Sequence, residues 1–578
     1  MKRYWKYIRP YLPYFIIGPV LMLSEVAGEI VLPKIMSSMM DYGVMENYGT
    51  QYIIGQAVKM ILCILIMICG GVGGHYFSAK ASTLFCADLR KDVFSRVQEF
   101  SFGDIDKFST GSLVTRLTND ITQLQNILRM GLIMAMRSPG MLIGGIIMAC
   151  TINARLALVL VIVIPVLAAA IALIMKTAFP RFQAMQKKLD ALNSGIQENI
   201  TNVRVIKSFV REDYEIEKFD KSNSELMDST LRAMKIVIAT MPVMMLTMNI
   251  TTLCVVGLGG RFVINGTMKV GSLTAFTTYI TQILMSLMMV SMVILQSSRA
   301  TASAARITEV LDTKSSLNDD NAKEKDRKVE NGSVEFKNVS FKYYADREEN
   351  ILDNISFRIG SGQTVGIIGT TGSGKTSLVQ LIPRLYDAVD GEVLVDGVNV
   401  KDYSLKHLRD GVGMVLQKNV LFSGTIEENL RWGDENASEE EVRKAAGAAQ
   451  ADGFVSAFTD GYNMELGQGG VNVSGGQKQR LCIARALLKK PKILILDDST
   501  SAVDTATEAK IRDAFRTELK DTTKIIIAQR ISSVIDADKI LVLENGRLVG
   551  EGTHEELIKS NGEYREIYYS QNDREVTA

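Results

Sequence analysis

The stretch TVGIIGTTGSGKTSLVQLIPRL, residues 364–385, decides the fold of the second half of this chain. TVGIIG is a short apolar run typical of a buried strand, and SLVQLIPRL has the pattern of a helix. Between them GTTGSGKT fits the pattern G-x-x-x-x-G-K-[ST] of a phosphate-binding loop. A strand, a glycine-rich loop and a helix in this order are the context that the motif requires. The stretch therefore predicts an α/β domain with a phosphate-binding loop.

Each part of this loop has an expected role. Glycines let backbone N–H groups close around phosphates, and the start of the following helix adds positive potential. Lys375 is expected to reach the β- and γ-phosphates of ATP, and the Thr376 hydroxyl to contact Mg²⁺. A chance glycine-rich turn is the alternative, and the flanking strand and helix argue against it. The expected phosphate-binding residues are Gly369, Thr370, Thr371, Gly372, Ser373, Gly374, Lys375, Thr376 and Ser377.

A second motif, KILILDDSTSAVD over residues 492–504, places acids directly after an apolar run. The run ILIL is typical of a buried strand that delivers a carboxylate to a metal, so Asp497 is the expected Mg²⁺-linked acid. Taken alone, the motif also fits an Asp that caps a helix after a strand. Beside a phosphate-binding loop, the metal reading is favoured.

Six apolar segments precede the α/β half, and each is close to the ~20 residues that cross a bilayer as a helix. Two long connections, residues 80–129 and 178–235, are rich in Lys and Arg and keep a helical period. Basic residues favour the cytoplasmic side, so these connections and both termini are expected there. The segments run approximately over residues 13–36, 53–79, 130–151, 155–177, 236–265 and 270–298.

The domain limits follow from composition. The polar stretch DTKSSLNDDNAKEKDRKVENG, residues 312–332, is typical of a linker. The sequence thus predicts a multidomain protein: an all-α transmembrane domain of six helices over residues 1–311, the linker, and an α/β phosphate-loop ATPase domain over residues 333–578. A net charge of +1 gives no bulk attraction to nucleic acid. The six cysteines are scattered, which disfavours a zinc site or a disulfide framework.

The segment NVSGGQKQR, residues 472–480, lies between the two phosphate-site motifs. Its VSGGQ resembles the LSGGQ signature of the ABC ATPase family. GQTVGIIGTTGSGKT, MVLQKNVLFSGTIEENL, VSGGQKQRLCIARAL and ILILDDSTSAVD all follow that family's pattern. The resemblance covers essentially the whole chain, and the six spans with two long inner connections resemble the exporter type, above all bacterial multidrug-type half-transporters.

The resemblance implies further site residues. Tyr343 matches the aromatic residue that stacks on adenine, and Gln417 matches the glutamine that touches Mg²⁺ and faces the membrane domain. The signature is expected to act in trans, on the γ-phosphate of ATP bound to the opposite subunit. The signature residues are Ser474, Gly475, Gly476 and Gln477. TGSLVTRLTND and NVRVIKSF, residues 110–120 and 202–209, resemble the segments beside the two coupling helices of the membrane domain.

Two departures from the family pattern bear on mechanism. Where the family carries the catalytic Glu this chain has Asp498, and where it carries the H-loop His this chain has Gln529. The carboxylate of Asp498 is one methylene shorter, and glutamine cannot carry a positive charge. Each change could be tolerable drift. Both together, with the ATP-binding motifs retained, resemble the degenerate-site subunit of heterodimeric bacterial exporters.

The membrane half gives weaker indications about substrate. Its last two segments contain clusters of methionine, an adaptable side chain found on promiscuous binding surfaces; packed or lipid-facing methionines are the alternative. Glu25 and Glu29 share one helix face and could attract cationic substrates, although pairing with Arg137, Lys34 or Arg261 is slightly favoured. The methionines are Met241, Met244, Met245, Met248, Met285, Met288, Met289 and Met292.

The resemblance implies an ATP-driven exporter of drugs, lipids or other amphipathic compounds in the plasma membrane. One chain supplies half of the family's working unit, so a second half-transporter is expected, a different chain with Glu and His at the catalytic positions. A homodimeric lipid or drug flippase that uses Asp498 is the first alternative. An ATP-gated channel or regulator is the second. The expected ligands are ATP and Mg²⁺, with no nucleic acid.

Overall fold

The computed structural model describes residues 2–343, 349–499 and 502–576. The chain divides into two compact units. The first unit comprises Met1–Gln98 and Gly111–Thr313, and the second comprises Glu99–Thr110 and Lys314–Ala578.

The first unit is helical throughout its main elements, and six of its helical stretches are long and apolar enough to cross a membrane. The predicted set of six apolar helices is therefore confirmed. A π-helical stretch, Met39–Met45, continues α2, and a second, Arg116–Asp120, leads into α6. The helices of this unit are α1 (Trp5–Ile8), α2 (Leu12–Ser38), α3 (Thr50–Gln98), α5 (Thr110–Thr115), α6 (Ile121–Ile152), α7 (Ala154–Thr201), α8 (Val203–Ser208), α9 (Glu212–Ile264) and α10 (Val270–Asp312).

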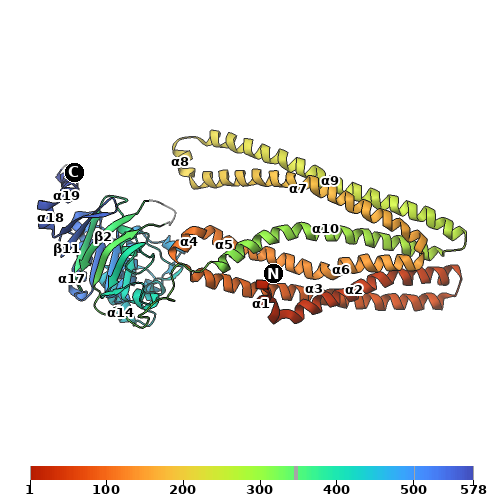
Figure 1. Ribbon diagram of the computed structural model, residues 1–578, viewed down its shortest axis with the longest axis horizontal. Coiled ribbons are helices and arrows are strands. Elements are labelled where there is room, and N and C mark those ends of the chain that lie inside the picture. The colour runs from red at the N-terminus through yellow and green to blue at the C-terminus, as the bar shows by residue number, and fades with distance from the viewer. Residues whose placement is uncertain (1, 344–348, 500–501, 577–578) are drawn as a thin grey trace. The chain divides into compact units, whose positions relative to one another are not determined.

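The long connections continue the membrane helices, as their helical period predicts. The helix α9 has 53 residues, which corresponds to about 80 Å at ~1.5 Å per residue. Helices α7 and α9 run side by side as a hairpin, with the short helix α8 at its turn (Figure 1). This hairpin carries the second long connection.

Small residues allow α2 and α3 to pack closely. A Cβ atom added to Gly28 would lie 2.2 Å from Met67 Cγ, and one added to Gly70 would lie 2.0 Å from Ser24 Oγ. Close approach of helix backbones at small residues is typical of packing inside a bilayer.

The helix α4 (Phe102–Phe108), from the first long connection, belongs to the second unit. A capping box starts it, in which Ser101 Oγ accepts from the Asp104 N–H and the Asp104 carboxylate accepts from the Ser101 N–H. The same carboxylate accepts from the backbone N–H of Ser316, at 3.1 Å. This hydrogen bond therefore joins the two parts of the second unit, α4 and the segment that follows α10.

The second unit is an α/β domain, as predicted. Its main sheet has the strand order β12-β11-β3-β10-β9-β6, parallel except for β12 (Arg547–Gly552). The parallel strands are β3 (Thr364–Gly369), β6 (Val412–Val415), β9 (Ile493–Asp497), β10 (Thr523–Ile527) and β11 (Lys539–Glu544). An antiparallel sheet is formed by β1 (Val334–Phe341), β2 (Leu352–Ile359), β4 (Asp390–Val395) and β5 (Val398–Asn399), and a two-stranded one by β7 (Gly424–Thr425) and β8 (Glu465–Leu466).

The helices of this unit lie between and around these strands. They are α11 (Lys375–Gln380), α12 (Leu405–Gly411), α13 (Ile426–Arg431), α14 (Glu439–Ala448), α15 (Asp452–Ala457), α16 (Gly475–Leu488), α17 (Thr505–Glu518), α18 (His554–Ser560) and α19 (Gly562–Val576).

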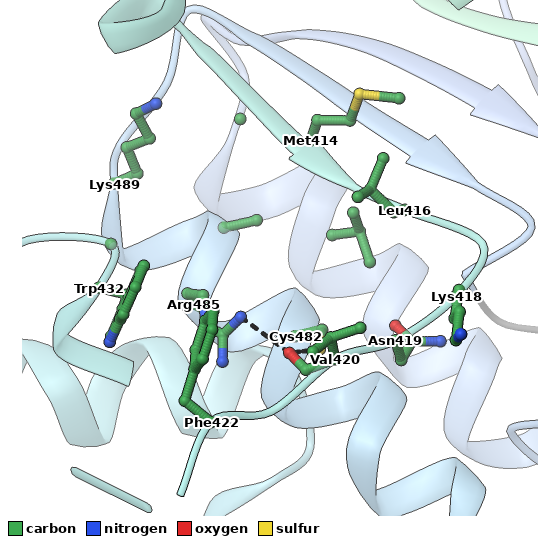
Figure 2. Close-up of a pocket in the computed structure, with 14 residues that line it drawn as sticks. Met414, Leu416, Lys418, Asn419, Val420, Phe422, Trp432, Cys482, Arg485 and Lys489 are labelled. Atoms are coloured by element: carbon green, nitrogen blue, oxygen red, sulfur yellow. Dashed lines mark hydrogen bonds between the residues drawn. The ribbon is translucent and has the colours of Figure 1, made fainter. Parts of the chain in front are cut away.

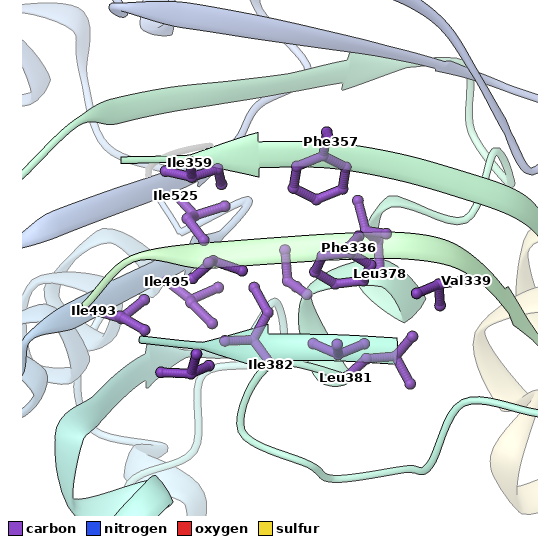
Figure 3. Close-up of a cluster of buried hydrophobic side chains, with 14 of the residues drawn as sticks. Phe336, Val339, Phe357, Ile359, Leu378, Leu381, Ile382, Ile493, Ile495 and Ile525 are labelled. Carbon is purple, nitrogen blue, oxygen red and sulfur yellow. The ribbon is translucent and has the colours of Figure 1, made fainter. Parts of the chain in front are cut away.

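A hydrophobic core fixes the helix that follows the phosphate-binding loop (Figure 3). Phe336 of β1 and Phe357 of β2 stack with ring centroids 4.6 Å apart. Leu378 of α11 packs into the same cluster as these rings, together with Ile495 of β9 and Ile525 of β10. Burial of these side chains stabilises β3 and α11, the two elements between which the loop is held.

Candidate nucleotide-binding site

The predicted site residues converge because parallel strands end at one edge of a sheet. In the register of the main sheet, Ile527 of β10 lies opposite both Ile367 of β3 and Asp497 of β9. The phosphate-binding loop follows β3 and Gln529 follows β10 by two residues. Gln417 follows β6, the neighbour of β9, in the same way. Motifs far apart in the chain therefore meet at the carboxyl edge.

Two glycines of the loop have no room for a side chain. A Cβ at Gly369, where φ is +157°, would lie 2.1 Å from the carbonyl oxygen of Leu543. At Gly374, where φ is +93°, it would lie 2.7 Å from Leu352 Cδ2. The left-handed region favours glycine, so the loop conformation depends on these positions. Thr370, Thr371, Gly372 and Ser373 form the turn between them.

Lys375 is the first residue of α11, and its side chain folds back over the loop. Its Nζ donates to the carbonyl oxygens of Gly369, at 2.8 Å, and of Thr370, at 2.7 Å. Burial lowers the pKa of this lysine, and the nearby carboxylates of Asp497 and Asp498 oppose that shift. The loop therefore holds an ammonium group at its centre, as its motif predicts.

Thr376 and Asp497 form the candidate metal site. The hydroxyl of Thr376 donates to Asp497 Oδ1 at 3.0 Å. The other oxygen, Asp497 Oδ2, is buried and makes no hydrogen bond within the described part of the chain. An oxygen pair of this kind suits Mg²⁺, which binds through one or two protein carboxylates together with phosphate oxygens and water. The residues present therefore fit this metal.

Asp498 and Gln529 contact each other directly. Gln529 Nε2 donates to Asp498 Oδ2 at 2.8 Å, and the side chain of Gln417 also hydrogen-bonds to Asp498. Burial raises the pKa of Asp498, while these two hydrogen bonds and the charge of Lys375 oppose the rise. Asp498 itself has a φ of +49°, in the left-handed region that Asp tolerates better than most residues. The structure brings all three predicted catalytic-position residues together.

Tyr343 lies beside the helix that follows the loop. Its hydroxyl and Ser377 Oγ share a hydrogen bond of 2.8 Å, and burial raises the pKa of this tyrosine. Its ring packs edge-on against Tyr386, with centroids 5.0 Å apart, and the hydroxyl of Tyr386 donates to Asp106 of α4 at 3.0 Å. The sequence gives no motif for Tyr386, and its aromatic character within RLYDAVD is the only hint.

The signature residues form the start of α16 and do not belong to the segments that surround the phosphate-binding loop. Ser474 caps the helix: its Oγ accepts from the Gln477 N–H at 3.3 Å, and Gln477 Oε1 accepts from the Ser474 N–H at 2.8 Å. Gly475 and Gly476 form the first turn between them. Among the described residues, no hydrogen bond joins this segment to the phosphate-binding loop of the same chain.

A cavity of about 290 Å³ lies beside the segment that follows Gln417 (Figure 2). Phe422 and Trp432 stack at its wall with centroids 4.2 Å apart, and both remain exposed. Arg485 donates to the carbonyl oxygen of Val420 at 3.1 Å, and burial lowers the pKa of Arg485. The lining thus combines exposed aromatic rings with basic side chains, which include Lys418 and Lys489.

In the first unit, methionines of α9 and α10 do gather around one cavity, of about 100 Å³. Leu167 of α7 completes part of its wall, and among the described side chains that line it Thr247 is the one with a hydroxyl. The side chain of Met292 lies outside the described part of the chain, and Met289 does not line the cavity. The methionines that line it are Met241, Met244, Met245, Met248, Met285 and Met288.

The two membrane glutamates pair with one arginine, as the favoured interpretation predicts. Arg137 of α6 donates from Nη1 to Glu25 Oε1 and from Nη2 to Glu29 Oε1, each at 2.7 Å. All three side chains are mostly buried. The cluster joins α2 to α6, and the second oxygen of Glu25, Oε2, is buried with no hydrogen-bond partner among the described residues.

The fold and the site define an ATP-binding cassette protein with its membrane domain on the same chain. The family profile for the ABC transporter transmembrane region matches residues 15–287, and the ABC transporter profile matches residues 352–501. The chain therefore belongs to the ABC transporters and is an exporter half-transporter. Members of this class work as dimers in a membrane, and their conserved cassette binds ATP and implies ATPase activity.

Individual relatives are similar over their full length. The chain is 39% identical to the ABC transporter ATP-binding protein YfiB of Bacillus subtilis, over 575 residues that cover 100% of this chain and 99% of YfiB. It is 32% identical to YgaD of the same species, a candidate multidrug export ATP-binding/permease protein, with 99% of each chain covered. A bacterial Atm1-family ABC exporter with ATP bound matches at a TM-score of 0.80 and 27% identity, over 97% of this chain and 98% of that one.

Proposed function

We propose that this chain is one half of a heterodimeric exporter that uses ATP to move drugs, lipids or other amphipathic compounds out across the plasma membrane. Its own ATP site binds nucleotide and hydrolyses it slowly, while its signature completes the hydrolytic site of a different partner chain. The observation that carries the proposal is the hydrogen-bonded pair of Asp498 and Gln529 at the catalytic positions.

Slow hydrolysis follows from the chemistry of this pair. The family's Glu polarises the attacking water, and the carboxylate of Asp498 ends one methylene short of that position. A misplacement of ~1 Å can cost ~100-fold in rate. Gln529 can donate a hydrogen bond to a phosphate, but it adds no positive charge as a protonated histidine would.

Nucleotide binding is assigned to the rest of the site. Tyr343 stacks on adenine, and the residues from Gly369 to Ser377 surround the phosphates, with Lys375 exchanging its carbonyl contacts for phosphate oxygens. Thr376, Asp497 and Gln417 hold Mg²⁺, which supplies charge neutralisation of the β- and γ-phosphates when bound. The buried Asp497 Oδ2, which has no hydrogen-bond partner in the described part of the chain, supports this assignment.

The dimer is supported by an exposed apolar turn at the end of the α7–α9 hairpin. Phe209 is 73% exposed and Val210 is 80% exposed. Val210 has a φ of +52°, a rare conformation for a β-branched residue. We infer that this turn docks on the partner's ATP-binding domain, at the groove that corresponds to the cavity beside Phe422 and Trp432.

The substrate class is inferred from the methionine-lined cavity. Its lining is almost wholly apolar, and methionine side chains adapt to ligands of different shape. Export across the plasma membrane, with the ATP-binding domain and both termini in the cytoplasm, is inferred from the basic long connections.

A homodimeric flippase that uses Asp498 is the second candidate, because Asp498 keeps a carboxylate at the catalytic position, where Gln417 and Gln529 hydrogen-bond to it. The ATPase activity of the purified chain, alone in nanodiscs, distinguishes the homodimer from the heterodimer. The heterodimer proposal predicts a low rate alone that rises at least ~10-fold when the partner half-transporter is added. A full rate in the chain alone, abolished by Asp498→Asn, would establish the homodimer instead.

A further inference from the structure

The last helix of the chain reaches the nucleotide site through one side chain. Gln571 of α19 donates from Nε2 to the carbonyl oxygen of Gln529 at 2.8 Å, and its Oε1 accepts from the backbone N–H of Ile531 at 2.9 Å. The side-chain amide of Gln571 therefore hydrogen-bonds to the backbone on both sides of Arg530, within the 529–531 segment. Gln529 in turn donates to Asp498, so a continuous series of hydrogen bonds runs from α19 to the catalytic-position carboxylate.

The helix presents Gln571 from a packed face. Tyr564, Tyr568 and Gln571 follow each other at intervals of four and three residues, which places them on one side of a helix. Tyr564 is fully buried and packs with Ile531, the last residue of the 529–531 segment, and with Val534. The Tyr564 hydroxyl is also hydrogen-bonded to His554 Nδ1 of α18, at 2.8 Å. Gln571 is thus held by an anchored element.

The 529–531 segment needs a hydrogen-bond partner of this kind. Residues 529–531 lead from β10 into a single short turn over Ile531–Ser533, so their backbone groups have few partners in regular structure. Gln529 and Arg530 are exposed and Ile531 is buried, so the backbone N–H of Ile531 requires an acceptor within the protein. Gln571 Oε1 provides that acceptor, and Gln571 Nε2 adds a donor for the exposed carbonyl of Gln529.

We propose that Gln571 is a positioning residue of the nucleotide site, which holds Gln529 so that its side-chain amide faces the terminal phosphate of ATP. This inference rests on the proposed function, in which Gln529 stands beside the γ-phosphate. One N–H of its amide is used by Asp498, and the second remains to donate to a phosphate oxygen. ADP lacks that phosphate, so Gln571 should affect the affinity of the site for ATP and leave its affinity for ADP nearly unchanged.

The experiment measures MgATP and MgADP affinity by displacement of trinitrophenyl-ATP from the full-length chain in nanodiscs. Gln571→Met keeps the length of the side chain and removes both hydrogen bonds. We expect it to weaken ATP binding about three- to tenfold, the range of one lost hydrogen bond, and to leave ADP binding within about twofold. The control is Ser570→Ala, since Ser570 is the exposed neighbour on α19 and its hydroxyl donates to the carbonyl oxygen of Ile567 in the same helix.

A mutant cycle separates positioning from a general structural role. If Gln571 acts through Gln529, then Gln529→Ala weakens ATP binding to a similar extent, and Gln571→Met adds little to it. Equal losses of ATP and ADP binding, unchanged ATP binding, or additive losses in the double variant would overturn the proposal. Retained ADP binding in all variants shows that the nucleotide site itself is intact, which keeps this test distinct from that of the proposed function.

Discussion

At the residue scale, the nucleotide site is a compact set of charges that compensate one another. Lys375 lies near the carboxylates of Asp497 and Asp498, which oppose the fall in its pKa on burial. Burial raises the pKa of each acid, and the lysine opposes that rise. A phosphate adds further negative charge beside these two carboxylates, so its binding requires both Lys375 and a metal cation.

Removal of the lysine should therefore weaken nucleotide binding. We expect Lys375→Ala to lower the affinity for MgATP about ten- to hundredfold, because hydrogen bonds from a charged donor contribute ~1.5–3 kcal/mol. Photolabelling with an ATP analogue measures it. Lys444→Ala, on the exposed surface of α14, is the matched control. Unchanged labelling in Lys375→Ala would mean that the loop is misassigned.

Removal of the metal should act through Asp497. We expect chelation of Mg²⁺ to weaken ATP binding to the unaltered chain, since Asp497 Oδ2 has no hydrogen-bond partner within residues 2–343, 349–499 and 502–576 that could replace the cation. Asp497→Asn should bind ATP as weakly with Mg²⁺ as without it. Titration of ATP with and without a chelator measures both, and an undiminished Mg²⁺ effect in Asp497→Asn would place the metal elsewhere.

The adenine contact should affect binding more than turnover. In the proposed site Tyr343 stacks on adenine, far from the bond that is broken, so Tyr343→Ala is expected to raise the KM for ATP with little change in kcat. Tyr343→Phe, which keeps the ring and loses the hydroxyl with its hydrogen bonds to Ser377 and Gln380, serves as the control and should have the smaller effect. A large fall in kcat at unchanged KM would contradict the stacking role.

At the scale of elements, the order of motifs along the chain predicts most of the site. The strands that end at Gly369, Asp497 and Ile527 are parallel neighbours, so sequence motifs after each of them meet without further information. Contacts between segments without a motif could not be predicted. Gln571 meets Gln529 across 42 residues, and Ser316 meets Asp104 of α4 across 212. Such pairs follow from packing, which composition and periodicity do not encode.

The α7–α9 hairpin provides a prediction at the same scale. Replacement of its apolar turn by charge, in Phe209→Asp, is expected to reduce export and partner-stimulated ATPase activity at least ~10-fold, because a buried unpaired carboxylate would oppose docking. Nucleotide binding to the chain should stay unchanged. The same change at Tyr569, an exposed aromatic on α19, is the control. Full activity of Phe209→Asp would show that the turn does not dock.

At the scale of the whole molecule, the proposed heterodimer builds each ATP site from residues of both chains. The nucleotide site at the carboxyl edge of this chain's sheet contains Asp498 beside Gln529, whereas the signature of the chain is close to the family pattern and caps α16 in regular geometry. The two features therefore serve different sites in the proposed heterodimer: the chain's own nucleotide site is the slow site, and Ser474 serves the partner's hydrolytic site. A substitution at Asp498 and a substitution at Ser474 should therefore affect ATPase activity and export differently.

The most direct test compares Asp498→Asn with Ser474→Arg, each co-expressed with the unaltered partner, by ATPase activity and substrate export. Asp498→Asn is predicted to retain most activity, because its carboxylate adds little transition-state stabilisation at the slow site. Ser474→Arg is predicted to abolish nearly all activity, because it places bulk and charge where the interface closes on the partner's ATP. Equal and severe losses in both variants would contradict the degenerate site, and near-normal activity of Ser474→Arg would contradict the role of the signature.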